Sequence, residues 1–185
     1  MPIILASASP RRQELLKKIT EDFISIPADI DETVPYGIPA EQAPEYLALK
    51  KAEHIAKGHP DSIVLGSDTG VFLDGEMLGK PCDRNEAYKM LETLSGRTHS
   101  VITGCAVVKG DKKVTFSCKT EVTFYELSRQ EIADYVSTGE CDDKAGAYGI
   151  QGKGALLIKE IKGDYFNVVG LPTAELYRSL KKFEI

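Results

Sequence analysis

The chain has 185 residues, of which 42% are hydrophobic and 28% charged, and its formal net charge is −5. This length allows one substantial core, and the acidic balance argues against a protein that coats polymeric nucleic acid, which requires a basic surface. No apolar run approaches the roughly 20 residues of a membrane-spanning helix, and the first basic residues follow the apolar N-terminal run, the reverse of a secretion signal. We therefore expect a cytoplasmic protein with neither a membrane nor a nucleic-acid polymer as partner.

The first half of the chain predicts alternating short strands and helices. In chain order the pattern indicates a strand over 2–6, a helix over 10–19, a strand over 23–30, a loop over 31–39 and a helix over 40–57. Ser9 is expected to cap the first helix, with Pro10 at its first position. Residues 62–79 are predicted as two strands with a break at Gly66–Gly70, the second ending in an Asp74-Gly75 hairpin turn.

The second half contains two long strand-like segments between helices. In order it predicts a helix over 83–94, strands over 99–110 and 112–127 with a Gly110-Asp111 turn, a helix over 128–137, a glycine-rich stretch over 143–155, strands around 155–161 and 165–170, and a helix over 172–183. Neither a repeat nor a linker interrupts the sequence. The predicted fold class is therefore α/β, a single domain over residues 1–185 with a large mixed, curved sheet flanked by helices.

The four cysteines do not suggest a metal site. Cys82, Cys105, Cys118 and Cys141 are widely spaced, without the C-x-x-C pairs of zinc proteins. Cys105 and Cys118 fall in strand-like runs and are expected to be buried thiols rather than disulfide partners. Among the histidines, only His99 lies in a segment of interest.

The stretch SASPRR suggests a phosphate-binding loop. Small residues after a strand let the backbone approach a ligand, and a helix N-terminus offers free N–H donors. Arg11 and Arg12 add planar forks that fit phosphate oxygens. The alternative is that Ser9 only caps the helix and both arginines are solvated.

A second candidate is the acidic residue in GSDTG. Asp68 follows the apolar run IVLG, so its carboxylate could bind a divalent cation or take a proton from water. Its alternative is a turn aspartate that binds its own backbone. Asp29, Asp31 and Glu32 in DIDETV could complete a metal site or line a solvated loop.

Three lysines and one amide stand in unusual local sequences. Lys51, Lys80 and Lys144 could each direct an ammonium at a phosphate, although surface lysine is the commoner role. Gln151 stands between glycines in AYGIQGKG, where its amide could both donate to and accept from a base edge.

Taken together, these segments resemble the Maf family of nucleoside triphosphate pyrophosphatases. The similarity runs from residue 3 to about residue 172, and the segments that carry it are LASASPRRQELL, DETV, KKA, SDT, LGKP, LSGRTHSVITG, DKAGAYGIQG and NVVGLP. The resemblance implies a mixed α/β fold related to the inosine triphosphate pyrophosphatases, with two lobes around a central cleft. It also implies a homodimer that cuts a nucleoside triphosphate to the monophosphate and pyrophosphate with a divalent cation, Mg²⁺ or Mn²⁺.

By position, the resemblance also implies site residues. Asp68 corresponds to the catalytic acidic residue, and we expect Glu32 and Asp68 to hold the metal. The implied substrate-binding residues are Ser7, Arg11, Arg12, Lys51, Lys80, Thr69 and Gln151.

The substrate is implied by one motif. DKAGAYGIQG looks like the branch of the family that acts on dTTP and UTP, normal or modified, with Arg12, Thr69 and Gln151 at the specificity positions. Gly70 departs from the family, where an aliphatic residue is common, and makes the strand more flexible. Two alternatives stay open: the branch that hydrolyses 7-methyl-GTP, and a non-catalytic nucleotide-binding regulator of cell division.

Overall fold

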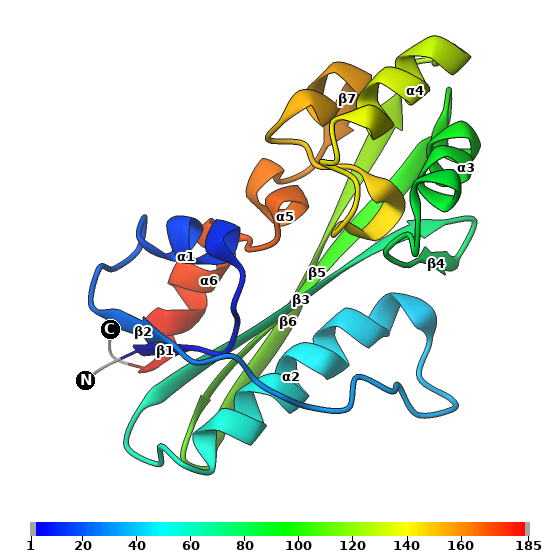
Figure 1. Cartoon of the computed structure of the whole chain (residues 1–185). Coiled ribbons are helices and arrows are strands. Elements are labelled where there is room, and N and C mark those ends of the chain that lie inside the picture. The colour runs from blue at the N-terminus through cyan, green and yellow to red at the C-terminus, as the bar shows by residue number, and fades with distance from the viewer. Residues whose placement is uncertain (1–2, 184–185) are drawn as a thin grey trace.

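Seven strands form one mixed sheet in the computed structural model, which describes residues 3–183 (Figure 1). The strands are β1 (Ile3–Leu5), β2 (Phe23–Ser25), β3 (Ile63–Leu73), β4 (Glu76–Leu78), β5 (Thr98–Lys109), β6 (Lys112–Phe124) and β7 (Ile158–Lys162). Their order is β2-β1-β3-β5-β6-β7, and β4 pairs with the end of β3. Strand β1 runs parallel to both β2 and β3, and the other strand pairs are antiparallel. The predicted α/β class with a mixed sheet is confirmed.

Helices cover both faces of this sheet. They are α1 (Pro10–Leu16), α2 (Ala43–Ala56), α3 (Arg84–Leu94), α4 (Arg129–Ser137), α5 (Tyr165–Val169) and α6 (Thr173–Leu180), with 3-10 turns η1 (Ala40–Gln42), η2 (Ala145–Ala147), η3 (Lys153–Leu157) and η4 (Lys181–Phe183). Helix α2 lies along one face, whereas α1, α5 and α6 lie on the other (Figure 1).

The predicted break at Gly66–Gly70 is wrong, because β3 runs without interruption from Ile63 to Leu73. Both glycines serve packing instead. A Cβ at Gly66 would collide with the carbonyl of Ala48 on α2, and one at Gly70 would lie 2.7 Å from the ring of Phe72. Glycine in a strand is a signal of close approach as well as of a bend, and here it marks close approach.

The predicted strand over 165–170 is also wrong, because this segment forms helix α5. Asp164 caps the helix by accepting a hydrogen bond from the backbone N–H of Phe166 at 2.8 Å. A short apolar run such as YFNVV does not distinguish a strand from a buried helical turn. The cap residue decides the outcome here.

Several other boundaries differ from the prediction. The strand expected over 23–30 ends at Ser25, and β7 begins only at Ile158, after the turn η3. The strand expected over 2–6 is β1, and Pro2 lies outside the described residues. Cys105 is buried as expected, but Cys118 is only partly buried and lines a surface groove of about 450 Å³ beside α6.

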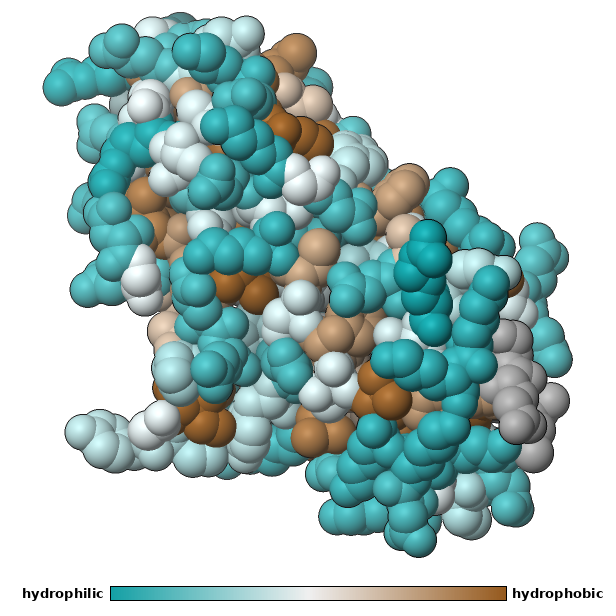
Figure 2. Space-filling model, turned by 180° about the vertical axis from the view of Figure 1, so that it is seen from behind, coloured by the Kyte–Doolittle hydropathy of each residue, from teal (hydrophilic) through white to brown (hydrophobic). Residues whose placement is uncertain are grey.

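The hydrophobic interior consists of three clusters around the sheet. The α2 core contains Val64 and Ala52 on the α2 face. On the opposite face, the α6 core contains Leu65 and Leu176 near one end of β3, and the α3 core contains Val71 near the other. Strand β3 therefore contributes to all three clusters. The face that Figure 2 shows is mainly hydrophilic, with small separate hydrophobic groups.

Two glycines allow α2 to lie directly on the sheet. A Cβ at Gly104 of β5 would collide with the backbone of Glu45 in the first turn of α2, just as one at Gly66 would meet Ala48. Gly104 is also the cross-strand partner of Asp68. The absence of side chains at these positions sets the height of α2 above Asp68.

We predict that Gly104→Ala lowers the free energy of unfolding by about 2 kcal/mol or more, because backbone atoms of α2 must move to admit one methyl group. Urea denaturation of the purified variant measures this loss. Gly58→Ala is the control, since the atom nearest to its Cβ is 3.8 Å away. Equal stability of the two variants would contradict the close approach of α2.

Candidate functional site

The polar segment of β3 lies between two hydrophobic cores. Alternate residues of β3 point to the same face, and Leu65 belongs to the α6 core while Val71 belongs to the α3 core. The residues between them on this face are Ser67 and Thr69, whereas Asp68 points toward α2. In the described part of the chain, β1 pairs with residues 63–65 and β4 with residues 71–73, so residues 66–70 have no strand partner at that edge. Within this segment Asp68 and Thr69 are partly exposed, whereas Gly66, Ser67 and Gly70 are buried.

Asp68, Lys51 and Glu32 form a compact charged cluster. The ammonium of Lys51 donates to Asp68 Oδ1 at 2.6 Å and lies 2.7 Å from Glu32 Oε1. The exposed fractions of the side chains are 11% for Lys51, 19% for Asp68 and 59% for Glu32, so the cluster opens to solvent on the Glu32 side. Because α2 is held close to the sheet, Lys51 reaches Asp68 from one turn beyond Ala48.

Positively charged residues lower the pKa of Glu32. The hydrogen bond from Lys51 lowers the pKa of Glu32, and the charges of Lys51, Lys80 and Arg12 add to this effect. Lys80 is exposed and lies in the segment after β4. Of the sequence-predicted residues, Glu32, Lys51 and Asp68 are brought together by direct contacts, and the charge of Lys80 adds to the field at Glu32.

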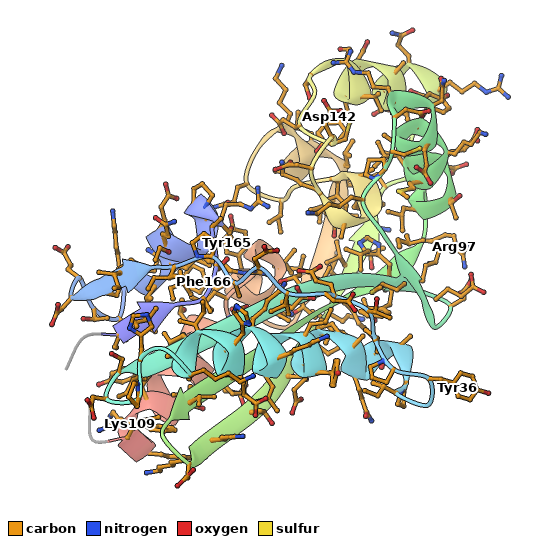
Figure 3. All side chains as sticks on the ribbon, turned by 60° about the horizontal axis from the view of Figure 1, so that its bottom comes forward. Tyr36, Arg97, Lys109, Asp142, Tyr165 and Phe166 are labelled. Atoms are coloured by element: carbon orange, nitrogen blue, oxygen red, sulfur yellow. The ribbon has the colours of Figure 1, made fainter. Side chains whose placement is uncertain are left out.

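The other two acidic residues of DIDETV do not join the cluster. The carboxylate of Asp31 accepts from the backbone N–H and the hydroxyl of Thr33 at 2.9 and 2.6 Å, which makes it a turn residue. Within residues 3–183, no three His, Cys, Asp or Glu side chains come together in a way that could hold a metal ion. The same segment continues to Tyr36, which points away from the molecule (Figure 3).

Arg12 is anchored at three points. Its Nε donates to the carbonyl of Gly170 at 2.9 Å, its Nη2 to Thr69 Oγ1 at 3.0 Å and its Nη1 to Ser7 Oγ at 3.3 Å. Ser9 caps α1, as predicted. Burial lowers the pKa of Arg12, and the charges of Asp68 and Glu32 oppose that effect. The alternative of two solvated arginines therefore fails for Arg12, which joins α1, β3 and the end of α5.

The glycine-rich stretch lies opposite α1. The hydrogen bond from Lys144 lowers the pKa of Asp143, and the charge of Arg11 adds to this effect. Lys144 donates to the carbonyl of Glu140 at 2.7 Å and to Asp143 at 2.9 Å, which ties it to its own loop. Gln151 is exposed. The preceding Ile150 packs on the α6 core, which holds residue 151 near α1 and α5.

Two residues at the site had no assigned role in the sequence analysis. Thr103 and Asn167 are fully buried, and the Thr103 hydroxyl lies 2.9 Å from that of Thr69. Asn167 is on α5, which Tyr165 and Phe166 mark in Figure 3. Both residues fall in quoted segments, SVITG and NVVGLP, but nothing in the sequence indicated that they meet.

His99 fixes the glycine-rich stretch to the sheet. Its Nε2 shares a hydrogen bond of 2.7 Å with the hydroxyl of Tyr148, and both rings pack edge to face with Phe124. Tyr135 adds a second anchor, because its hydroxyl accepts from the backbone N–H of Gly149 at 3.1 Å. His99 Nδ1 is buried without a partner, and burial lowers the pKa of His99 to about 4.

We predict that His99 makes unfolding pH-dependent. Since it titrates near 6.5 when unfolded and about 4 when folded, the unfolded chain binds the extra proton, and stability falls as the pH drops from 6.5 toward 4. The shift corresponds to about 3 kcal/mol. Urea unfolding at pH 4.5 and 7 should show a smaller difference for His99→Gln than for the parent. An NMR titration midpoint of His99 near 6.5 in the folded protein would contradict this.

The fold matches known structures over almost its full length. The Ham1 protein of Staphylococcus aureus superposes with a TM-score of 0.57 at 17% identity, covering 100% of both chains. A HAM1 protein from Coxiella burnetii gives 0.57 at 20% identity, covering 98% of this chain and 99% of its own. At these identities the likeness concerns the fold alone, a mixed α/β sheet flanked by helices.

The family follows from sequence comparison. The chain belongs to the Maf-like proteins, which it matches over residues 2–183. A relative from Bacillus cytotoxicus, described as a dTTP/UTP pyrophosphatase, is 52% identical and covers 98% of this chain and 95% of its own. A relative from Bacillus velezensis with the same description is 50% identical and covers 99% of this chain and 97% of its own.

Within residues 3–183, no helix combines the length and hydrophobicity needed to cross a membrane.

Proposed function

We propose that this chain hydrolyses dTTP and UTP, including modified forms, to the monophosphate and pyrophosphate. One observation carries the proposal. Two consecutive residues of β3 connect a carboxylate–ammonium cluster at Asp68 to an anchored guanidinium at Thr69. The site thus combines groups that neutralise phosphate charge with a group that can accept a proton from water. The description shared by relatives at 50% identity and above supports the substrate.

A divalent cation, Mg²⁺ or Mn²⁺, belongs to this proposal. Asp68 and Glu32 offer the oxygen ligands that such ions prefer, and both already contact one positive charge at Lys51. Two carboxylates fit this role, because Mg²⁺ is commonly held by one or two carboxylates together with phosphate oxygens and water. When bound, the ion would neutralise phosphate charge and polarise the reacting phosphorus centre.

The remaining charged residues divide by position. We propose that Lys51 and Lys80 neutralise the triphosphate near the carboxylates, and that Arg11, Arg12 and Ser7 hold it from the start of α1. The free N–H groups at the start of α1 add to the positive potential there. The substrate would then lie between the α6 core and the α3 core, and we propose that these correspond to the two lobes that the resemblance implies.

Gln151 is the proposed reader of the base. Its amide can donate to O4 of uracil or thymine. A rotated amide would fit cytosine equally well, so selection against cytosine requires a neighbour that cannot reverse its hydrogen bond. Two other expectations, a homodimer and a cytoplasmic location, stay predictions.

The decisive experiment is a pyrophosphate-release assay on the purified protein. The substrates are UTP, dTTP, CTP, GTP and 7-methyl-GTP, each with Mg²⁺, Mn²⁺ or a chelator. Metal-dependent release from UTP and dTTP supports the proposal. Preference for 7-methyl-GTP would place the chain in the other branch, and binding without turnover would indicate a regulator.

We predict that Asp68→Asn lowers kcat by about 10²–10⁴-fold, the range expected for loss of a positioned acid–base group. The isosteric amide preserves volume and Lys51 keeps its ion pair with Glu32, so the variant should keep the fold of the parent. Asp74→Asn is the control in the turn that follows the same strand, because Asp74 lies in the left-handed region, at φ 53°, where asparagine is tolerated. Parent-level turnover by Asp68→Asn would refute the assignment.

A further inference from the structure

A chain of hydrogen bonds connects Arg12 to the interior. Arg12 Nη2 contacts Thr69 Oγ1 at 3.0 Å, Thr69 Oγ1 contacts Thr103 Oγ1 at 2.9 Å, and Thr103 Oγ1 contacts the backbone carbonyl of Asn167 at 2.9 Å. Thr103 and Asn167 are fully buried, whereas Thr69 is partly exposed. This series of hydrogen bonds therefore begins beside the proposed substrate and ends in the core.

The chemistry of the two ends fixes the direction of every bond. A guanidinium can only donate, so Thr69 accepts from Arg12. A carbonyl can only accept, so the single hydroxyl proton of Thr103 points to Asn167. The contact between the two hydroxyls still needs one proton, and only that of Thr69 remains. Thr69 therefore donates to Thr103.

The side chain of Asn167 holds Thr103 in this orientation. Its Oδ1 accepts from the backbone N–H of Thr103 at 3.0 Å, and its Nδ2 donates to the carbonyl of Val101 at 3.0 Å and to Thr120 Oγ1 at 2.8 Å. Since every polar group of this amide is bonded in a buried place, the amide cannot rotate without loss of several bonds. The buried amide of Asn167 thus fixes the orientation of Thr103.

We infer that Thr103 is a positioning residue for base selection: it fixes Thr69 as a hydrogen-bond acceptor only. The hydroxyl proton of Thr69 is used, and one lone pair remains for a ligand. The group that meets it must be a donor, and the donor that uracil and thymine have and cytosine lacks is N3–H. Thr69 is then the fixed neighbour that the rotatable amide of Gln151 requires. This inference rests on the proposed function.

The test removes the hydroxyl that fixes Thr69. In Thr103→Val the Thr69 proton loses its acceptor, so Thr69 can turn and donate to N3 of cytosine. We expect the ratio of kcat/KM for UTP over CTP to fall about tenfold, the scale of one hydrogen bond. Thr103→Ser keeps the hydroxyl and should restore the ratio.

Thr120→Val is the matched control. Thr120 is equally buried and also bonds Asn167, but it does not contact Thr69. Both valine variants should melt at lower temperature, and only Thr103→Val should lose selectivity. An unchanged UTP to CTP ratio in folded Thr103→Val, or the same fall in Thr120→Val, would overturn the inference.

A substrate analogue tests the same point on the unaltered protein. N3-methyl-UTP has no N3–H, so the protein should process it about as poorly as CTP, whereas turnover equal to that of UTP would overturn the inference. Absence of pyrophosphate release from both UTP and dTTP would instead refute the proposed function. A protein that hydrolyses UTP and CTP equally well would retain that function and refute only the inference.

Discussion

The site depends on the continuity of β3 through two hydrophobic cores. Leu65 at one end and Val71 toward the other are held by apolar packing on the same face. This packing fixes the backbone of the three polar residues between them, 67–69. Their own side chains gain little from burial. A break in this strand would change the directions in which Asp68 and Thr69 point. It would also disturb the packing of both cores. Continuity of the strand is thus a condition for both stability and chemistry.

The two faces of this segment supply different chemistry. On the α2 face, Lys51 holds two carboxylates that would otherwise repel each other, and its own burial is compensated by both of them. On the opposite face, Thr69 and Arg12 are part of a neutral and cationic network that reaches the core. Since successive residues of a strand point to opposite faces, neighbouring positions in the sequence serve these separate networks.

The sequence indicated candidate site residues more readily than the packing around them. Asp68, Arg12 and Lys51 could be proposed because charged residues in an apolar context are rare, and because their segments matched a family. Gly66 and Gly70 were misinterpreted as a break, since the sequence does not show that α2 or an aromatic ring lies above them. Thr103 and Asn167 could not be found, because a buried threonine or asparagine gains its role only from partners far along the chain.

The site has a rigid side and an adaptable side. Arg12 is oriented by three bonds before any ligand arrives, so little of its side-chain entropy remains to be lost on binding. Lys80 and Gln151 are exposed, so in the proposed complex the substrate itself would have to order them. A phosphate chain is the same in every nucleotide and suits a preformed cradle. A base that must be distinguished requires at least one contact that cannot adapt, and in this fold such a contact has to be anchored in the core.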